Sequence, residues 1–261
     1  MRIKVLGCHG SEAFGTDPAG RRVECHPSGF LFDDSVLVDA GTVATAEDPT
    51  GVDRIRHIFL SHTHFDHIQA LPALADRLAG RASVTIYSVP EVLESLHTHL
   101  LNDRIWPDFT RIPNVEHPTF RLTAVEEERP RVVDALRLTP VRVNHTVPTV
   151  GYVIQSEDAA VLYSGDTHET RRIWEAAART PHLKAALIEA SFPDELSDLA
   201  LRSGHLTPRL LGQEFAKIGR PDIALYVYHL KPRYLPELRA QLQALKLPNL
   251  RILADGDILT V

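Results

Sequence analysis

The sequence predicts an α/β protein in which two β-sheets pack together and helices cover their outer faces. Short apolar runs of strand length, rich in Val, Ile and Leu, recur along the whole chain. Segments with leucine at helical spacing follow several of these runs, which is the pattern of layered α/β folds. No linker-like or low-complexity stretch divides the 261 residues, so we expect one domain spanning residues 1–261.

The strands expected in the first half are short apolar runs between polar turns, at residues 2–6, 29–32, 35–38, 56–60 and 84–87. The polar stretch 7–27 is expected to be a loop. An apolar stripe from Ile68 to Leu78, stopped by Gly80, predicts one helix, and a second is expected to begin at Pro90.

The second half is richer in strands, which are expected at residues 120–125, 135–143, 151–155, 160–164, 185–189, 223–228, 252–253 and 258–261. Helices are expected at 169–179 and 207–218, and a last one is marked by leucines between Leu235 and Leu245. The proline-containing segment 102–118 predicts a structured loop of the kind that often carries substrate contacts.

Composition narrows the class of protein. The net charge of −6 and a pI near 6.1 argue against broad binding to a nucleic-acid backbone. Cys8 and Cys25 show no C-x-x-C spacing, which favours free thiols over a disulfide or a zinc knuckle. The short apolar start does not resemble a signal peptide, and no run is long enough to span a bilayer, so a cytoplasmic protein is expected.

Four candidate metal ligands crowd into the stretch that follows the strand at 56–60. His62, His64 and Asp66 alternate, so a continuing strand would point all three to one face. His67 breaks the alternation and can reach a second point in space. One tetrahedral ion would be over-supplied by these groups, so the cluster favours two adjacent metal ions.

Three later candidates also stand where an apolar strand ends, namely His145, Asp166 and His229. Strand ends on one edge of a layered α/β fold converge, so these residues are natural partners of the first cluster. One ion is expected to be held by His62, His64 and His145, and the other by Asp66, His67 and His229. Asp166, with a water or hydroxide, is expected to bridge the two ions and leave each an open position.

The residues Ser61-His62-Thr63-His64-Phe65-Asp66-His67 resemble the H-x-H-x-D-H signature of the metallo-β-lactamase superfamily. The positions of His145, Gly165-Asp166 and His229 follow the order of that superfamily's other ligands, and Asp39-Ala40-Gly41 is similar to its D-x-G turn. The resemblance covers nearly the whole chain. It implies a four-layer αβ/βα sandwich, with two mixed β-sheets flanked by helices.

Further stretches resemble the class II cyclic-nucleotide phosphodiesterases, namely residues 102–110, 188–193, 203–208 and 229–232. This resemblance implies a metal-dependent hydrolase that converts 3′,5′-cyclic nucleotides such as cAMP or cGMP to 5′-nucleotides through a metal-bridging hydroxide. Asn102, Trp106 and Phe109, in the first of these stretches, are the candidate substrate contacts. Trp106 and Phe109 could stack on a purine, and equally they could anchor their own loop. The loop at Glu12–Arg22 departs from the family pattern.

The chemistry of cyclic phosphodiester hydrolysis assigns roles to three residues. Asp66 can orient the hydroxide as well as bind metal. His205 lies in a turn before the helix capped by Thr207 and is the candidate proton donor to the leaving alkoxide. Glu189, at a strand end, is the candidate group that orients His205. The alternative is that His205 is an ordinary turn histidine.

The sequence is also compatible with other functions. A tRNA 3′-end processing endonuclease, or another phosphodiesterase of the same superfamily, is the alternative enzyme. The endonuclease shares the ligand set, although the acidic chain argues against a nucleic-acid partner. A metal-binding or nucleotide-sensing module without turnover is the non-enzyme alternative. Histidine and carboxylate ligands suit Zn²⁺, and Mn²⁺ or Fe²⁺ also fit. The candidate substrates are cAMP, cGMP and a larger cyclic dinucleotide, and the alternatives for the assembly are a monomer and a homodimer.

The remaining histidines are expected to be structural. His97 and His99 lie two apart on a helix and point to nearly opposite sides, so they cannot chelate one ion. His9 lacks a partner at ligand spacing and is expected to be a surface or loop residue, as are His26, His57, His117, His168 and His182.

Overall fold

The computed structural model describes residues 1–16, 22–43 and 51–261. Its backbone forms two seven-stranded sheets and one separate two-stranded ribbon. The ribbon pairs β2 (Ala13–Thr16) with β3 (Arg22–Cys25). The first sheet, in spatial order, contains β16 (Ile258–Thr260), β1 (Arg2–Gly7), β4 (Gly29–Phe32), β5 (Val36–Val38), β6 (His57–Phe59), β7 (Val84–Ser88) and β8 (Phe120–Ala124).

The second sheet comes almost entirely from the second half of the chain. In spatial order it contains β15 (Leu250–Ile252), β14 (Ala224–Tyr228), β13 (Leu183–Glu189), β12 (Ala160–Tyr163), β11 (Val150–Gln155), β10 (Leu136–Arg142) and β9 (Arg131–Val133). Both sheets are mixed, because parallel neighbours (β5 to β8, and β12 to β15) adjoin antiparallel ones.

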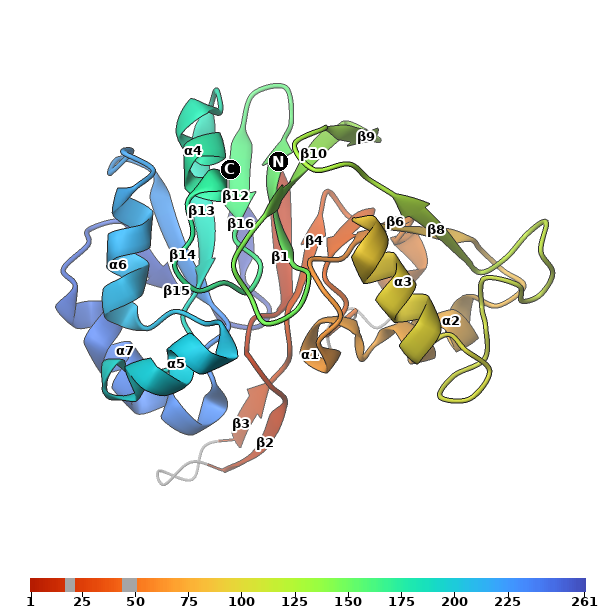
Figure 1. Ribbon diagram of the computed structural model, residues 1–261, viewed down its shortest axis with the longest axis horizontal. Coiled ribbons are helices and arrows are strands. Elements are labelled where there is room, and N and C mark those ends of the chain that lie inside the picture. Colours follow the sequence, from red (N-terminus) through yellow and green to blue (C-terminus); the bar gives the residue numbers. More distant parts are fainter. Residues whose placement is uncertain (17–21, 44–50) are drawn as a thin grey trace.

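Helices cover the two outer faces, which completes the four layers (Figure 1). The helices beside the first sheet are α1 (Phe65–Ile68), α2 (Leu71–Leu78) and α3 (Pro90–His99). Those beside the second sheet are α4 (Arg172–Arg179), α5 (Ser197–Ser203), α6 (Pro208–Ala216) and α7 (Leu235–Ala244). Short 3-10 turns occupy Gly51–Arg54, Asp194–Leu196 and Pro232–Tyr234. None of the helices in the described part of the chain is long and apolar enough to cross a membrane.

The structure corrects the expected elements at several points. The loop predicted over 7–27 contains the ribbon of β2 and β3, whose strands are only four residues long and therefore give too short a pattern to mark them in sequence. The helix expected from Ile68 begins instead at Leu71, as α2, and Ile68 is the last residue of the separate short helix α1. The pattern also does not predict β9 or α5, which carry few buried apolar residues.

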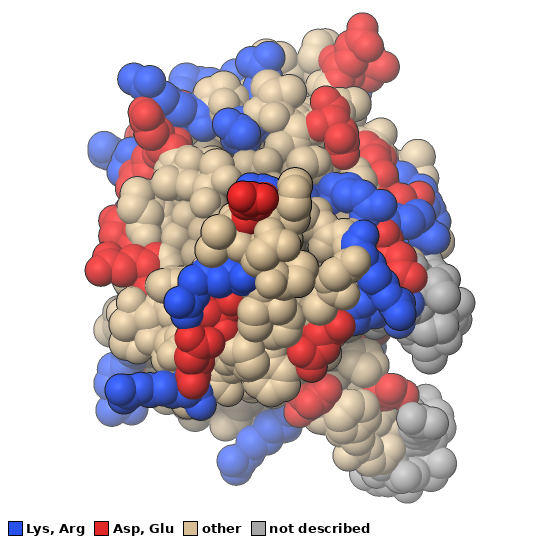
Figure 2. All heavy atoms as spheres, turned by 90° about the vertical axis from the view of Figure 1, so that its right-hand side faces the viewer, with Lys and Arg blue, Asp and Glu red and all other residues tan. Residues whose placement is uncertain are grey.

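The face beyond α3 carries Lys and Arg side chains interspersed with Asp and Glu (Figure 2). Exposed ion pairs of the described chain include Arg77 with Asp53 and Arg111 with Asp103. Exposed pairs of this kind contribute little stability and leave the face with mixed sign.

The main core lies between the two sheets. Alternate residues of β12 serve different layers: Val161 and Tyr163 face the core between the sheets, whereas Ala160 and Leu162 pack under the helices of the second sheet. This burial on both faces explains why strands such as β12 read as continuous apolar runs.

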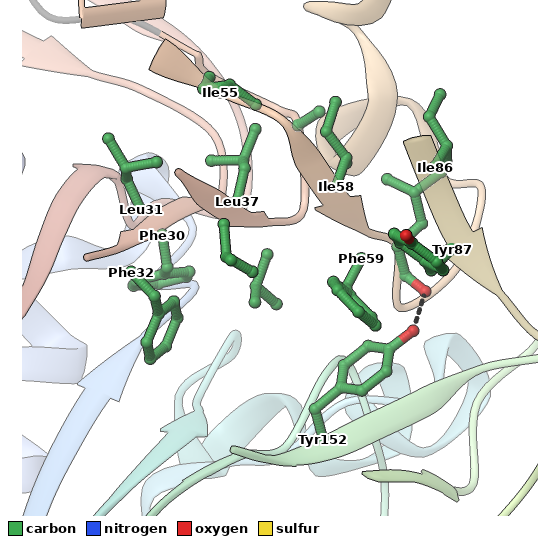
Figure 3. Packing of buried hydrophobic residues seen from close by; sticks show 14 of the residues in the cluster. Phe30, Leu31, Phe32, Leu37, Ile55, Ile58, Phe59, Ile86, Tyr87 and Tyr152 are labelled. Atoms are coloured by element: carbon green, nitrogen blue, oxygen red, sulfur yellow. Dashed lines mark hydrogen bonds between the residues drawn. The ribbon is translucent and has the colours of Figure 1, made fainter. Parts of the chain in front are cut away.

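One aromatic group ties the two sheets together next to β6 (Figure 3). Phe59 stacks on Tyr87 with ring centroids 4.6 Å apart and meets Tyr152 of the other sheet edge-on at 5.7 Å. The Tyr152 hydroxyl donates a 2.7 Å hydrogen bond to the carbonyl of Leu60, at the point where the chain leaves β6.

Replacing Tyr152 with Phe tests this cross-sheet bond. Leu60 O keeps the hydrogen bond from Ser88 Oγ, so the change leaves no buried acceptor unpaired. We expect the free energy of unfolding to fall by about 0.5–1.5 kcal/mol, as for one neutral hydrogen bond, in urea titrations followed by circular dichroism. A loss above about 3 kcal/mol would contradict the view that the bond acts alone.

Candidate metal centre

The seven predicted ligands converge at one edge of the sandwich. His62 and His64 follow β6, and His145 follows β10. Asp166 follows β12, and His229 follows β14. The carboxyl ends of these strands lie at the same edge because neighbouring parallel strands run in one direction.

The first cluster does not continue as a strand. The strand β6 ends at Phe59, and α1 begins at Phe65, so Asp66 leaves the alternation expected from the sequence. The turn at Ala40 explains this, because Ala40 N–H donates to His67 O and Ala40 O accepts from Ala70 N–H. The turn thereby takes up backbone groups at the end of α1 and presents Asp66 and His67 from a helix.

The structure brings the side chains together in the two expected sets. One set contains His62, His64 and His145, and the other contains Asp66, His67 and His229; in each set the donor atoms lie within 4.8 Å of one another. His145 Nε2 is 3.0 Å from His64 Nδ1, and His67 Nε2 is 3.2 Å from His229 Nε2.

Asp166 lies between the two sets. Its Oδ2 is 3.3 Å from His67 Nε2, 3.2 Å from His229 Nε2 and 3.7 Å from His62 Nε2. Burial alone would raise the pKa of Asp166, but the imidazoles of His229 and His67 hold that pKa well below its usual range. Asp166 is therefore a carboxylate placed to contact both sets, as the bridging role requires.

Hydrogen bonds on the outer side of four imidazoles determine which ring nitrogen faces the centre. His67 Nδ1 donates to Asp39 Oδ2 at 2.7 Å, and His145 Nδ1 donates to Gly204 O at 2.8 Å. Both acceptors lack a hydrogen, so each Nδ1 carries the proton. The Nε2 lone pair of each ring is then available to a metal ion.

Two serines act in the same way on the other rings. Ser61 Oγ donates to Asp39 and so accepts from His62 Nδ1 at 2.9 Å. Ser191 Oγ donates to Glu189 and so accepts from His229 Nδ1 at 2.8 Å. Their Nε2 lone pairs also face inward.

This donor set fits divalent metal ions. Several imidazole nitrogens and the Asp166 carboxylate face one another, so a metal ion between them would be bound by donors of both sets in place of protons. His62 Nε2 and Asp166 Oδ1 are buried and have no hydrogen-bond partner in the described structure. Burial also lowers the pKa of His62, His145 and His229, so these rings stay neutral and able to bind metal.

Asp39 supports the centre from behind. Its buried carboxylate accepts from Ser61 N and Oγ at 2.7 Å each, from His67 Nδ1 and from the Tyr163 hydroxyl at 2.6 Å. These bonds place Asp39 behind the ligands, in the turn that resembles the D-x-G turn of the superfamily. Although burial opposes a charge on His67, Asp166 and Asp39 raise the pKa of that ring.

His205 and Glu189 form a pair beside the centre. His205 Nδ1 is 2.7 Å from Glu189 Oε1, and its ring stacks on His229 with centroids 5.2 Å apart. Burial tends to lower the pKa of His205, but Glu189 raises it above its usual value. The preceding Gly204 has φ of 73°, and a Cβ there would lie 2.7 Å from His145 Nδ1, so this turn requires glycine.

The predicted substrate contacts in the loop after α3 are corrected in part. Phe109 is 4% exposed and packs in the core against Phe120, so its ring has no free face for a nucleotide base. Asn102 uses its side-chain oxygen to accept from Arg104 N and Ile105 N, which closes its own turn. Trp106 is half-buried, and its contact with substrate stays a prediction.

Three contributors escape prediction from the sequence. Ser61 and Ser191 orient histidines, yet a serine at a strand end has no signature of that role. Lys231 Nζ lies 3.6 Å from Asp66 Oδ2 and adds positive charge beside the donor set that contains Asp66. A signal for Lys231 exists in hindsight, because it stands two residues after the ligand candidate His229 on the same strand end.

Comparison with known families agrees with the geometry. The model of the β-lactamase superfamily domain matches residues 34–229, which contain all seven candidate ligands. The chain belongs to this superfamily. The matched range begins just before β5 and ends at His229, so it includes every strand end that contributes to the centre.

Several superfamily relatives are cyclic-nucleotide phosphodiesterases by name. The chain is 27% identical over 207 residues to a probable 3′,5′-cyclic-nucleotide phosphodiesterase of Yersinia pestis, with 69% of this chain and 58% of the relative covered. It is 25% identical over 241 residues to 3′,5′-cyclic-nucleotide phosphodiesterase 1 of Saccharomyces cerevisiae, covering 76% and 64%. The chain thus spans about three fifths of the length of these two relatives.

Another relative and a solved structure complete the comparison. A ribonuclease Z of Kineococcus radiotolerans is 27% identical over 258 residues, with 80% of this chain and 79% of the relative covered. Unliganded yeast PDE1 matches 100% of this chain and 99% of its own with a TM-score of 0.77 at 18% identity, which confirms the predicted metallo-β-lactamase fold.

Replacing Asp39 with Asn tests the supporting hydrogen bonds. The amide cannot accept from all four donors, so His67 and Ser61 lose their orientation. We expect divalent metal affinity to fall about 10–100-fold in competition titrations with a chromogenic chelator. Asp108→Asn, a buried carboxylate in the loop after α3, is the matched control and should leave the affinity unchanged. Equal affinities in the wild type and the Asp39 variant would contradict the assigned role.

Proposed function

We propose that this chain is a binuclear metal-dependent phosphodiesterase that hydrolyses 3′,5′-cyclic nucleotides to 5′-nucleotides. The observation that carries the proposal is the meeting of two three-residue donor sets at Asp166, with the His205–Glu189 pair beside them. The names of relatives from Yersinia pestis and Saccharomyces cerevisiae support the cyclic-nucleotide substrate.

The donor set suits two Zn²⁺ ions, one held by His62, His64 and His145 and one by Asp66, His67 and His229. When bound, two such ions supply a nucleophile from water at neutral pH and neutralise charge on the phosphoryl oxygens. Asp166 contributes a carboxylate to both sets. Asp66 is more exposed than the other carboxylate, so it is the one placed to orient the attacking water.

His205 is the proposed proton donor. Glu189 holds the Nδ1 side of the ring at 2.7 Å and favours the protonated form. The Nε2–H is then available to the 3′-oxygen, which takes the proton as its bond to phosphorus breaks. Glu189 is a positioning residue in this scheme, and Ser191 helps to fix it through a 2.9 Å hydrogen bond.

A tRNA 3′-end endonuclease is the second candidate function. The similarity to the ribonuclease Z of Kineococcus radiotolerans favours it, because that match covers 79% of the relative. The mixed charges of the face in Figure 2 and the net charge of −6 do not favour a long polyanionic substrate.

A substrate panel separates the two functions. Protein loaded with Zn²⁺ or Mn²⁺ is incubated with cyclic AMP, cyclic GMP and a precursor tRNA, and the products are resolved by chromatography and gel electrophoresis. We expect 5′-nucleotides from at least one cyclic nucleotide. Cleavage of the tRNA alone would overturn the proposal and favour the second candidate.

Replacing His205 with Ala tests the proton donor. We expect kcat on the cyclic nucleotide to fall by about 10²–10⁴-fold, while the amount of bound metal stays that of the wild type. His182→Ala, in an exposed turn that precedes β13 at the end of the strand opposite to Glu189, is the control and should not change kcat. An unchanged kcat in the His205 variant would remove this role from the mechanism.

A further inference from the structure

A separate group of metal-binding side chains lies where the N-terminal strand meets the C-terminal segment. The donor atoms of Cys8, His9 and Asp255 all lie within 4.8 Å of one another. The expectation that His9 lacks a partner is wrong, because Asp255 reaches it from 246 positions away in the sequence. Cys8 and His9 are buried, with 1% and 7% of their surface exposed.

The spacing of the three donor atoms is that of ligands around one small ion. Cys8 Sγ and His9 Nδ1 each lie 3.2 Å from Asp255 Oδ1, and they are 3.9 Å from each other. In a tetrahedral zinc site, the usual bond lengths place sulfur, nitrogen and oxygen ligands about 3.3–3.6 Å apart. Shifts of a few tenths of an ångström would complete the geometry.

The carboxylate is held in place by backbone groups that do not depend on the two side chains. Cys8 N–H donates to Asp255 Oδ1 at 3.0 Å, and His26 N–H donates to Oδ2 at 2.8 Å. Ligating carboxylates in metal sites are commonly oriented by such hydrogen bonds. Asp255 therefore presents Oδ1 to Cys8 and His9 in a fixed direction.

A cavity gives an ion access to this group. The cavity has a volume of about 670 Å³. His9, Cys25 and Asp255 line it, together with Glu24, Arg239 and apolar residues. The side chains thus combine a buried donor set with a route from solvent, which a metal site needs.

The chemistry of Cys8 argues against a nucleophilic role. Burial raises the pKa of the Cys8 thiol to about 12, so at neutral pH it is a thiol rather than the reactive thiolate. A divalent cation would supply the charge that stabilises the thiolate. Thiolate sulfur and imidazole nitrogen are both ligands that suit Zn²⁺.

We propose that Cys8, His9 and Asp255 bind one further divalent ion of the zinc type, with its fourth position open to the cavity. Before binding, His9 is an imidazolium paired with Asp255. Binding displaces the thiol proton of Cys8 and the Nδ1 proton of His9, both of which leave to solvent, and the now neutral ring keeps its Nε2–H. The site is distinct from the two donor sets around Asp166, and the inference does not depend on the proposed hydrolysis.

Such an ion would stabilise the proposed binuclear centre indirectly, by fixing the backbone that contacts the ligand candidate His229. His229 N–H donates to Cys8 O at 2.6 Å, and Gly10 N–H donates to Leu230 O at 3.2 Å. His229 has φ of 67°, a conformation that non-glycine residues adopt only when neighbouring contacts hold them there. An ion on Cys8 and His9 fixes the segment that makes those contacts.

Cobalt(II) titration tests the site directly. Metal-free protein is titrated with Co²⁺, and its near-ultraviolet absorption is followed for the thiolate-to-cobalt charge-transfer band. The two donor sets around Asp166 contain only nitrogen and oxygen, so they cannot give this band. We expect the wild type to bind one more equivalent than the Cys8→Ser variant and to show the band, which that variant lacks.

Cys25→Ser is the matched control, because it removes the other buried thiol, which lines the same cavity, and leaves the three proposed ligands in place. We expect this variant to keep the band and the additional equivalent, which assigns both to Cys8. A wild type without the band, or a Cys25 variant that loses it, would overturn the proposal. These two outcomes decide the matter even if the Cys8 variant does not fold.

Discussion

The centre depends on hydrogen bonds that determine which nitrogen of each histidine faces inward. An imidazole that could choose either tautomer would present a proton to the centre as readily as a lone pair. Here Asp39, Gly204 O, Ser61 and Ser191 each occupy the Nδ1 side of one ring. These hydrogen bonds leave the inward Nε2 atom of each ring free to donate its lone pair to a metal ion. The four rings are those of His62, His67, His145 and His229.

These supports come from parts of the chain that are distant in sequence. Asp39 follows β5 in the first sheet and accepts from Tyr163, which ends β12 in the second sheet. Tyr152 joins the same two layers through Leu60 O. The orientation of the ligands therefore depends on how the two sheets pack. A shift of one sheet against the other would move both the ligands and the groups that orient them.

The sequence predicted the fold class and the seven candidate ligands because both leave local marks. A buried strand is a continuous apolar run, and a ligand at its end interrupts that run with His or Asp. The thiol–imidazole group at Cys8 and His9 leaves no such mark, since its third member, Asp255, is brought near only by folding. Phe109 shows the opposite failure, because an aromatic residue in a loop looks the same in sequence whether it faces a ligand or the core.

The Asp66 side chain shows a further limit. Alternation predicted that it would share a strand face with His62 and His64, and it still reached the expected donor set, but from helix α1. Sequence spacing predicted the partners correctly and the local conformation wrongly. The reason is the turn at Ala40, whose backbone hydrogen bonds to the end of α1 form across 27 positions of sequence and are invisible to a local pattern.

The most direct test of the central claim is an anomalous difference map, recorded at the zinc absorption edge, from crystals grown with Zn²⁺. Two peaks about 3.5–4 Å apart, on either side of the Asp166 carboxylate, are the predicted result. A single peak at this edge of the sandwich, or none, would contradict a binuclear centre built from the two donor sets.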